Sequence, residues 1–219
     1  MSEFLTIGLH AEGPTDHKLL KHIIRRTVED IILNCDKDIE INPIIEIDKI
    51  SGSYNQNIEH AAKEAFDSGI KCLILHCDAD KSSIDHVMCH KITPAIETIH
   101  NHTEKTNMCS NLIPLVPIYM SEAWMLSDIE LLKQEIGAER IDNATLGLTR
   151  SAESYADPKA TLVEAIRISQ ASKSRRHRNF NISDLYIPLG QKTPLTKLKQ
   201  LSSYQQFYTD LKSICLPYC

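Results

Sequence analysis

The chain has 219 residues, of which 42% are hydrophobic and 24% are charged, and it is not enriched in glycine or proline. This composition is typical of a globular protein with a full hydrophobic core, and it excludes fibrous and disordered chains. No apolar run reaches the roughly 18 residues of a transmembrane helix, and the first residues lack the pattern of a signal peptide. Seven cysteines without a CxxC pair indicate reduced thiols rather than a disulfide framework, so we expect a cytoplasmic protein without a membrane anchor.

The formal net charge of −5 combines two parts of opposite sign. Residues 1–149 hold 24 acidic and 13 basic residues, whereas residues 150–219 hold 5 acidic and 11 basic residues. An acidic first part suits a cation site, and a basic second part could contact phosphates. Four nearly contiguous basic residues are candidates for binding a nucleic acid: Lys173, Arg175, Arg176 and Arg178. A solvated basic loop would give the same pattern, so charge alone leaves both interpretations open.

Strand and helix patterns alternate along the first part of the chain. A short apolar run at residues 4–11 predicts a strand, and Pro14 followed by apolar residues at helical spacing predicts a helix up to Ile32. The same patterns predict further strands at 41–50, 72–77 and 112–120, and further helices near 58–66, 92–105 and 122–134. This βα order predicts an α/β fold with a parallel sheet and right-handed crossovers.

The pattern changes from about Gly137 onward. Helices are expected at residues 158–169 and 194–214, with a basic, polar stretch between them. We therefore expect an α/β domain at residues 1–136 and a mainly helical, basic extension at residues 137–219 that packs on it.

Acidic residues follow three of the predicted strands: Glu12 follows the first, Asp78 and Asp80 the third, and Glu122 the fourth. Ligands of parallel sheets bind beyond the carboxyl ends of the strands, so these side chains should lie at one edge. Residues two apart in an extended segment point the same way, so Asp78 and Asp80 could bind one ion. Converging carboxylates repel one another unless a cation neutralises them, and their oxygens suit Mg²⁺ or Mn²⁺. A single aspartate after a strand is more often a cap or turn residue, so a metal site is indicated only because several acidic residues are expected at the same edge.

Four blocks of sequence carry these residues in order: EGPTD at 12–16, LILHCDAD at 73–80, PIYMSEAWMLSD at 117–128 and DPK at 157–159. The first resembles the Glu-Gly motif of Toprim domains, in the EGxT[DE] form of OLD-like nucleases. The second is similar to the hydrophobic strand of that family that ends in DxD. The third and fourth are similar to downstream blocks of small OLD-like proteins. The resemblance covers residues 4–135 well and the rest loosely.

The resemblance implies a Toprim-type fold and metal-dependent hydrolysis of phosphodiester bonds, as in nucleases of DNA repair or anti-phage defence. It implies that Glu12, Asp78 and Asp80 hold a metal ion and that Glu12 also acts as a general acid or base. It implies further acidic ligands for a second metal and one catalytic basic residue, for which the candidates are Asp16, Glu122, Asp128 and Lys159. Glu122 could instead cap the fourth helix, and Lys159 could simply be a first-turn residue after Pro158.

Other motifs limit the alternatives. His86 and His90 are four residues apart and could bind zinc from one helix face, whereas His76, inside an apolar strand, is expected to be a hydrogen-bonded core residue. The chain lacks the GxxxxGK[ST] and GxGxxG motifs of a P-loop ATPase and of a nicotinamide-binding protein. An ATPase often accompanies the domain in the OLD-like group, so a separate ATPase subunit is a candidate partner.

The sequence therefore predicts a divalent-metal-dependent nuclease that acts on DNA or RNA. The alternative is a non-catalytic Toprim-fold module that binds a phosphorylated ligand or a partner protein. Both interpretations are compatible with a monomer or an oligomer.

Overall fold

The computed structural model describes residues 3–33, 35, 37–80, 83–101, 107–171 and 180–219. The four basic residues predicted to bind nucleic acid, at positions 173, 175, 176 and 178, lie outside the described residues. Within the described residues, no helix combines the length and the apolar character that crossing a membrane would require.

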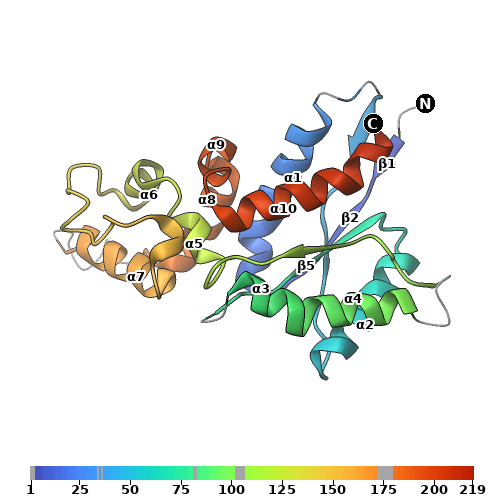
Figure 1. Cartoon of the computed structure of the whole chain (residues 1–219). Helices are drawn as coiled ribbons and strands as arrows, with labels where there is room; N and C mark the ends of the chain where they lie inside the picture. Colours follow the sequence, from blue (N-terminus) through green and yellow to red (C-terminus); the bar gives the residue numbers. More distant parts are fainter. Residues whose placement is uncertain (1–2, 34, 36, 81–82, 102–106, 172–179) are drawn as a thin grey trace.

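A four-stranded parallel sheet confirms the predicted α/β fold (Figure 1). Its strands, in spatial order, are β4 (Ile45–Ile47), β2 (Ile7–His10), β5 (Cys72–His76) and β6 (Leu112–Leu115). Every residue of β2 and β5 is buried, as expected for central parallel strands that are covered on both faces. The sheet therefore brings the carboxyl ends of β2, β5 and β6 to one edge.

A second, two-stranded parallel sheet pairs β1 (Glu3–Leu5) with β3 (Ile39–Ile41). The single strand predicted at residues 41–50 is therefore wrong, because β3 pairs with β1 whereas β4 pairs with β2. The chain crosses between the two sheets at Asn42, whose side chain donates a hydrogen bond of 2.8 Å to Thr6 Oγ1. The proline that follows Asn42 has no N–H to donate to a ladder, which favours an interruption there.

Helices cover both faces of the sheet. Side chains of β5 alternate between two cores: Cys72 and Ile74 face one, and Leu73 and Leu75 face the other. Figure 1 shows α1 (Pro14–Ile32) and α10 (Ser202–Cys215) on one side, and α2 (Tyr54–Asp67) and α4 (Thr93–Asn101) on the other. The chain reaches α4 through α3 (Ile84–Val87) and a π-helical turn, η1 (Met88–Ile92). The predicted helix at 92–105 is thus described only up to Asn101.

The residues after β6 form a mainly helical region, as predicted. Its elements are α5 (Glu122–Met125), α6 (Ile129–Ile136), η3 (Ala152–Ser154), α7 (Pro158–Ser169), η5 (Ile182–Asp184), α8 (Tyr186–Lys192), α9 (Leu195–Leu198), α10 and η6 (Leu216–Tyr218). Tyr186, Tyr204 and Phe207 are buried in the same core as Leu9 and Ile74 of the sheet. The region therefore packs on the sheet, while a domain boundary at residue 136 stays a prediction.

Two predicted helices are split in the structure, and one helix was not predicted. The helix expected at 122–134 is split into α5 and α6, because Asp128 adopts an extended backbone and accepts a hydrogen bond of 3.2 Å from Leu131 N as the N-cap of α6. The helix expected at 194–214 is split into α9 and α10. Helix α8 was not predicted, because Pro188 and Gly190 weaken its helical signal.

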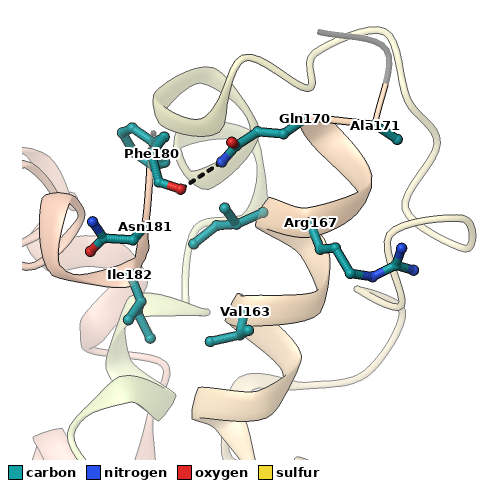
Figure 2. Close-up of a pocket in the computed structure, with 8 residues that line it drawn as sticks. Val163, Arg167, Gln170, Ala171, Phe180, Asn181 and Ile182 are labelled. Carbon is teal, nitrogen blue, oxygen red and sulfur yellow. Dashed lines mark hydrogen bonds between the residues drawn. The ribbon is translucent and has the colours of Figure 1, made fainter. Parts of the chain in front are cut away.

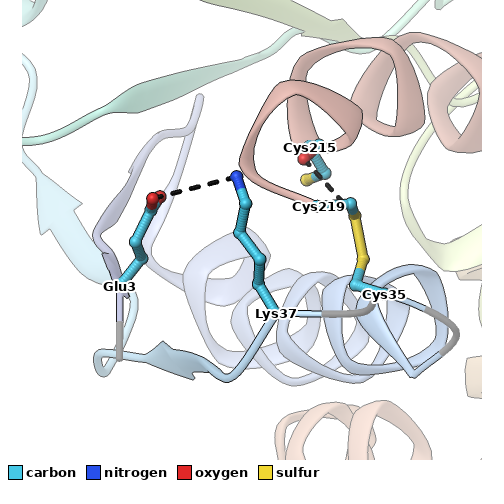
Figure 3. Close-up of a disulfide and its surroundings, with 5 residues drawn as sticks. All are labelled: Glu3, Cys35, Lys37, Cys215 and Cys219. Atoms are coloured by element: carbon cyan, nitrogen blue, oxygen red, sulfur yellow. Dashed lines mark hydrogen bonds and ion pairs between the residues drawn. A yellow bond between two sulfur atoms is a disulfide. The ribbon is translucent and has the colours of Figure 1, made fainter. Parts of the chain in front are cut away.

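The expectation of reduced cysteines is wrong for one pair. Cys35, just after α1, and Cys219, just after η6, form a disulfide with a Cα–Cα distance of 4.8 Å (Figure 3). The two residues are separated by 184 positions and meet because α10 packs against α1. The structure describes all seven cysteines, and the other five are free thiols, of which Cys89 is exposed.

Candidate functional site

His76, at the end of β5, joins two of the predicted acidic residues. The backbone N–H of Glu12 donates a hydrogen bond of 3.4 Å to His76 Nδ1, and His76 Nε2 lies 3.1 Å from Asp78 Oδ1. The backbone N–H of Ser121, which follows β6, donates to the same Asp78 oxygen at 3.1 Å. The ends of β2, β5 and β6 therefore meet at His76 and Asp78, as the sequence predicts.

The environment of His76 perturbs both members of its pair with Asp78. Burial lowers the pKa of His76, but the hydrogen bond to Asp78 and the carboxylates of Asp16 and Glu12 outweigh burial, so the pKa is raised. Burial raises the pKa of Asp78, against the opposing effect of His76. The side chain of His76 is fully buried. The prediction of a hydrogen-bonded core histidine is confirmed.

Ser121 extends the group to Asp16 and Glu122. Its hydroxyl donates a hydrogen bond of 2.6 Å to Asp16 Oδ1 and lies 3.5 Å from Glu122 Oε2. Asp16 Oδ2 in turn lies 3.9 Å from His76 Nδ1. Asp16, in the first turn of α1, and Glu122, in the first turn of α5, are thus connected to the end of β5. We call Glu12, Asp16, Asp78 and Glu122, with His76 and Ser121, the acidic cluster.

Glu122 is buried and has two partners from the helical region. Tyr186, in α8, donates a hydrogen bond of 2.5 Å from its hydroxyl to Glu122 Oε1, and Lys159 Nζ, in α7, lies 3.6 Å from the same oxygen. Burial, together with Glu122, raises the pKa of Tyr186, which keeps the phenol protonated as a donor. The structure therefore places Lys159 beside the acidic cluster, where the resemblance expects a basic residue.

Lys91, in η1, is a member of the site that sequence reasoning missed. Its ammonium donates hydrogen bonds of 3.0 Å to Glu12 Oε1 and 2.8 Å to Cys77 Sγ, and it lies 4.7 Å from the centre of the Tyr54 ring. Burial raises the pKa of Glu12, but Lys91 outweighs burial, so the pKa is lowered. The sequence signal was a lysine in a histidine-rich segment, and its position depends on a π-helical turn that periodicity does not reveal.

Asp80 is placed differently from the expectation. Its φ is 51°, so the segment is not extended there, and the extended geometry from which a shared direction of Asp78 and Asp80 was predicted is wrong. Tyr119, after β6, has a φ of 60°, and its carbonyl accepts a hydrogen bond of 2.8 Å from Asp80 N. Positive φ is costly for a tyrosine, on the order of 1–3 kcal/mol. This backbone strain occurs at the same edge of the sheet as the acidic cluster.

Asp128 and the histidine pair His86 and His90, which were also candidate metal ligands, have partners close to them in sequence. Asp128 serves as the N-cap of α6, and none of its described contacts reaches the acidic cluster. The rings of His86 and His90 stack with centroids 4.2 Å apart, and His90 Nδ1 lies 3.0 Å from the carbonyl oxygen of His86. Together with Lys91, Asp78 and Asp80, they line a hollow of about 220 Å³.

The acidic cluster fits a divalent cation in its chemistry but is not assembled around one. Carboxylate oxygens are the ligands that Mg²⁺ and Mn²⁺ prefer. Among the residues that the structure describes, however, no three His, Cys, Asp or Glu side chains converge on one metal position. Lys91 instead neutralises Glu12, and His76 lies against Asp78 and Asp16. A cation bound by Glu12 would have to displace Lys91.

A larger hollow of about 510 Å³ is separate from this site (Figure 2). It lies between α7 and residues 180–182, where Gln170 donates a hydrogen bond of 2.7 Å to the carbonyl oxygen of Phe180. Its lining includes apolar side chains such as Val163 and Ile182 and contains no carboxylate among the described residues. It therefore contributes no ligand to the acidic cluster.

Comparison with known proteins identifies the family. Residues 11–211 match the model of the family described as a domain of unknown function, DUF4276. None of the curated proteins and none of the solved structures matches the chain. The family match spans most of the sequence and includes every residue of the acidic cluster. The chain therefore belongs to the DUF4276 family.

Proposed function

We propose that the chain is a divalent-metal-dependent nuclease whose active site is formed by the acidic cluster and Asp80 at the carboxyl edge of the sheet. The observation that carries this proposal is that acidic residues following three strand ends are linked to one another by hydrogen bonds through His76 and Ser121. Partly buried carboxylates that repel one another are costly to a scaffold, and perturbed titratable groups gather at functional sites. The resemblance of the four sequence blocks to Toprim and OLD-like proteins supports the same activity.

The resemblance suggests the metal ligands, and the contacts suggest the roles of the residues around them. Glu12, Asp78 and Asp80 would hold one Mg²⁺ or Mn²⁺, and Asp16 and Glu122 would contribute to a second. Such ions, when bound, activate a water molecule and stabilise the leaving oxygen of a phosphodiester. His76 orients Asp78, and Tyr186 orients Glu122. Lys159 offers a positive charge to a substrate oxygen from its position beside Glu122.

The proposal leaves Asp128 out of the metal ligands, because its carboxylate caps α6. It includes DNA or RNA as substrate, a cytoplasmic location, a role in DNA repair or anti-phage defence, and a separate ATPase subunit as partner. The basic segment that contains Arg175 and Arg176 would contact the phosphate backbone of the substrate, which gives affinity without sequence preference.

A cleavage assay tests the proposal. Purified protein is incubated with plasmid, single-stranded DNA and RNA in the presence of Mn²⁺, Mg²⁺ or a chelator. We expect metal-dependent cleavage that falls at least about a hundredfold in Asp78→Asn, since even outer-shell changes cost ten- to hundredfold. The matched control is Glu164→Gln, which removes an exposed carboxylate that pairs with Arg167. Equal cleavage by both variants would locate the chemistry elsewhere.

One observation favours the non-catalytic alternative as a second candidate. Lys91 already neutralises Glu12, His76 Nε2 lies 3.1 Å from Asp78 Oδ1, and no three-ligand metal group is present among the described residues. A module of this kind would bind a phosphorylated ligand or a partner protein without cleaving nucleic acid. Absence of cleavage with every metal and substrate in the same assay would support it.

A further inference from the structure

We propose that Lys91 is an exchangeable counter-ion, which holds Glu12 when no metal is bound and moves to a phosphate group of the substrate when a divalent cation takes its place. This inference rests on the proposed function. It adds the residue that competes with the metal and the subsite that receives the phosphate.

The contacts of Lys91 place a positive charge where a cation would bind Glu12. The ammonium of Lys91 forms an ion pair of 3.0 Å with Glu12 Oε1. It also donates a hydrogen bond of 2.8 Å to Cys77 Sγ, which directly precedes Asp78. A cation that bound Glu12 would therefore meet the charge of Lys91.

The second position of Lys91 is the hollow of about 220 Å³ that it lines. Asp78, Asp80, His86 and His90 line the same hollow as Lys91. A water molecule takes up about 30 Å³, so the hollow has room for a phosphate group beside a cation. Lysine binds phosphate as a flexible point charge, which suits a hollow that the proposed metal ligands Asp78 and Asp80 also line.

Lys91 can make this exchange without a large backbone movement. Its side chain is 38% exposed, so the ammonium can leave Glu12 for the solvent side of the hollow. It has four flexible methylene groups. It lies in the π-helical turn η1, and such turns are frequent at functional sites.

The experiment measures Mn²⁺ binding by isothermal titration calorimetry in the full chain. We expect Lys91→Met to bind Mn²⁺ about three- to tenfold more tightly than the parent, because a half-exposed ion pair is worth up to about a factor of five and a repulsive charge is also removed. Lys91→Arg keeps the charge and should bind as the parent does. Lys21→Met is the matched control, since Lys21 is 35% exposed and forms a 2.7 Å pair with Glu46 outside the acidic cluster.

A second titration, of adenosine monophosphate at saturating Mn²⁺, tests the phosphate position. Lys91→Met should bind this nucleotide at least about fivefold more weakly than the parent, and Lys21→Met should not. Tighter Mn²⁺ binding with unchanged nucleotide binding would overturn the phosphate contact.

The two titrations separate this inference from the proposed function. If the parent binds Mn²⁺ and Lys91→Met binds it equally well, the metal site stands and the counter-ion role is overturned. If Mn²⁺ binds only to Lys91→Met, the counter-ion role is supported. If neither protein binds Mn²⁺, the proposed metal site is overturned and the exchange with it.

Discussion

The contact between α8 and α1 gives a prediction in which packing opposes helix propensity. A β-carbon at Gly190 would lie 2.6 Å from the backbone oxygen of Leu19 and 3.3 Å from His22 Cβ. In an isolated helix, Gly→Ala stabilises by about 1 kcal/mol. Overpacking typically costs about 1–3 kcal/mol, and here the neighbour is a helix carbonyl that cannot rotate away. Arg26 also donates a hydrogen bond of 3.1 Å to the Gly190 oxygen, which holds α8 in place.

A contact of 2.6 Å with a backbone oxygen belongs to the upper part of the range for overpacking, about 2–3 kcal/mol. After subtraction of the propensity gain of about 1 kcal/mol, we expect Gly190→Ala to lower the free energy of unfolding by roughly 1–2 kcal/mol. In a protein of this size, each kcal/mol shifts the melting temperature by about 2–4 °C, so thermal unfolding followed by circular dichroism resolves the change. Gln191→Ala, at the exposed neighbouring position, is the control and should change little. If Gly190→Ala melts at or above the parent temperature, the close approach of α8 is refuted, and with it the placement of Tyr186 against Glu122.

Three further predictions concern the site. Tyr186→Phe removes a donor to the buried Glu122 and should cost about 1–3 kcal/mol in urea unfolding; no loss would mean that the hydrogen bond is not formed. Burial raises the pKa of Asp78, so the protonated carboxyl contributes stability below the usual value of 3.8, and this contribution is lost as the pH rises through the higher pKa of the folded state. Metal-free Asp78→Asn should therefore melt at or above the parent temperature at pH 7, and any gain should disappear below about pH 4. A lower melting temperature at pH 7 would make Asp78 structural. Iodoacetamide at pH 8 should alkylate exposed Cys89 well before Cys77, whose pKa is about 11, and equal rates would contradict the burial of Cys77.

The sequence was sufficient to predict the parallel sheet and the edge at which the acidic residues lie. Continuous apolar runs such as the one at 72–77 are typical of central parallel strands, and the residues that follow parallel strands of one sheet meet at one edge. This is why Glu12, Asp78 and Glu122 were predicted together. Local interruptions were less visible, since the split at Asn42 depends on which strand each half pairs with.

The partners of the acidic residues could not be predicted, because they come from distant elements. Tyr186 is 64 positions from Glu122, and Lys91 is 79 positions from Glu12, so both contacts depend on how helices pack rather than on a motif. The backbone at Asp80 turns because its N–H bonds to Tyr119, which no local pattern encodes. The disulfide between Cys35 and Cys219 likewise requires α10 to lie along α1.

The most direct test of a metal site at the acidic cluster is a crystal structure grown with Mn²⁺, with anomalous data collected at the manganese edge. The structural account predicts an anomalous peak within about 2.2 Å of carboxylate oxygens of Glu12 and Asp78, with the ammonium of Lys91 moved away from Glu12. A structure at saturating Mn²⁺ in which Lys91 still bonds to Glu12 and no peak lies at this edge of the sheet would contradict it.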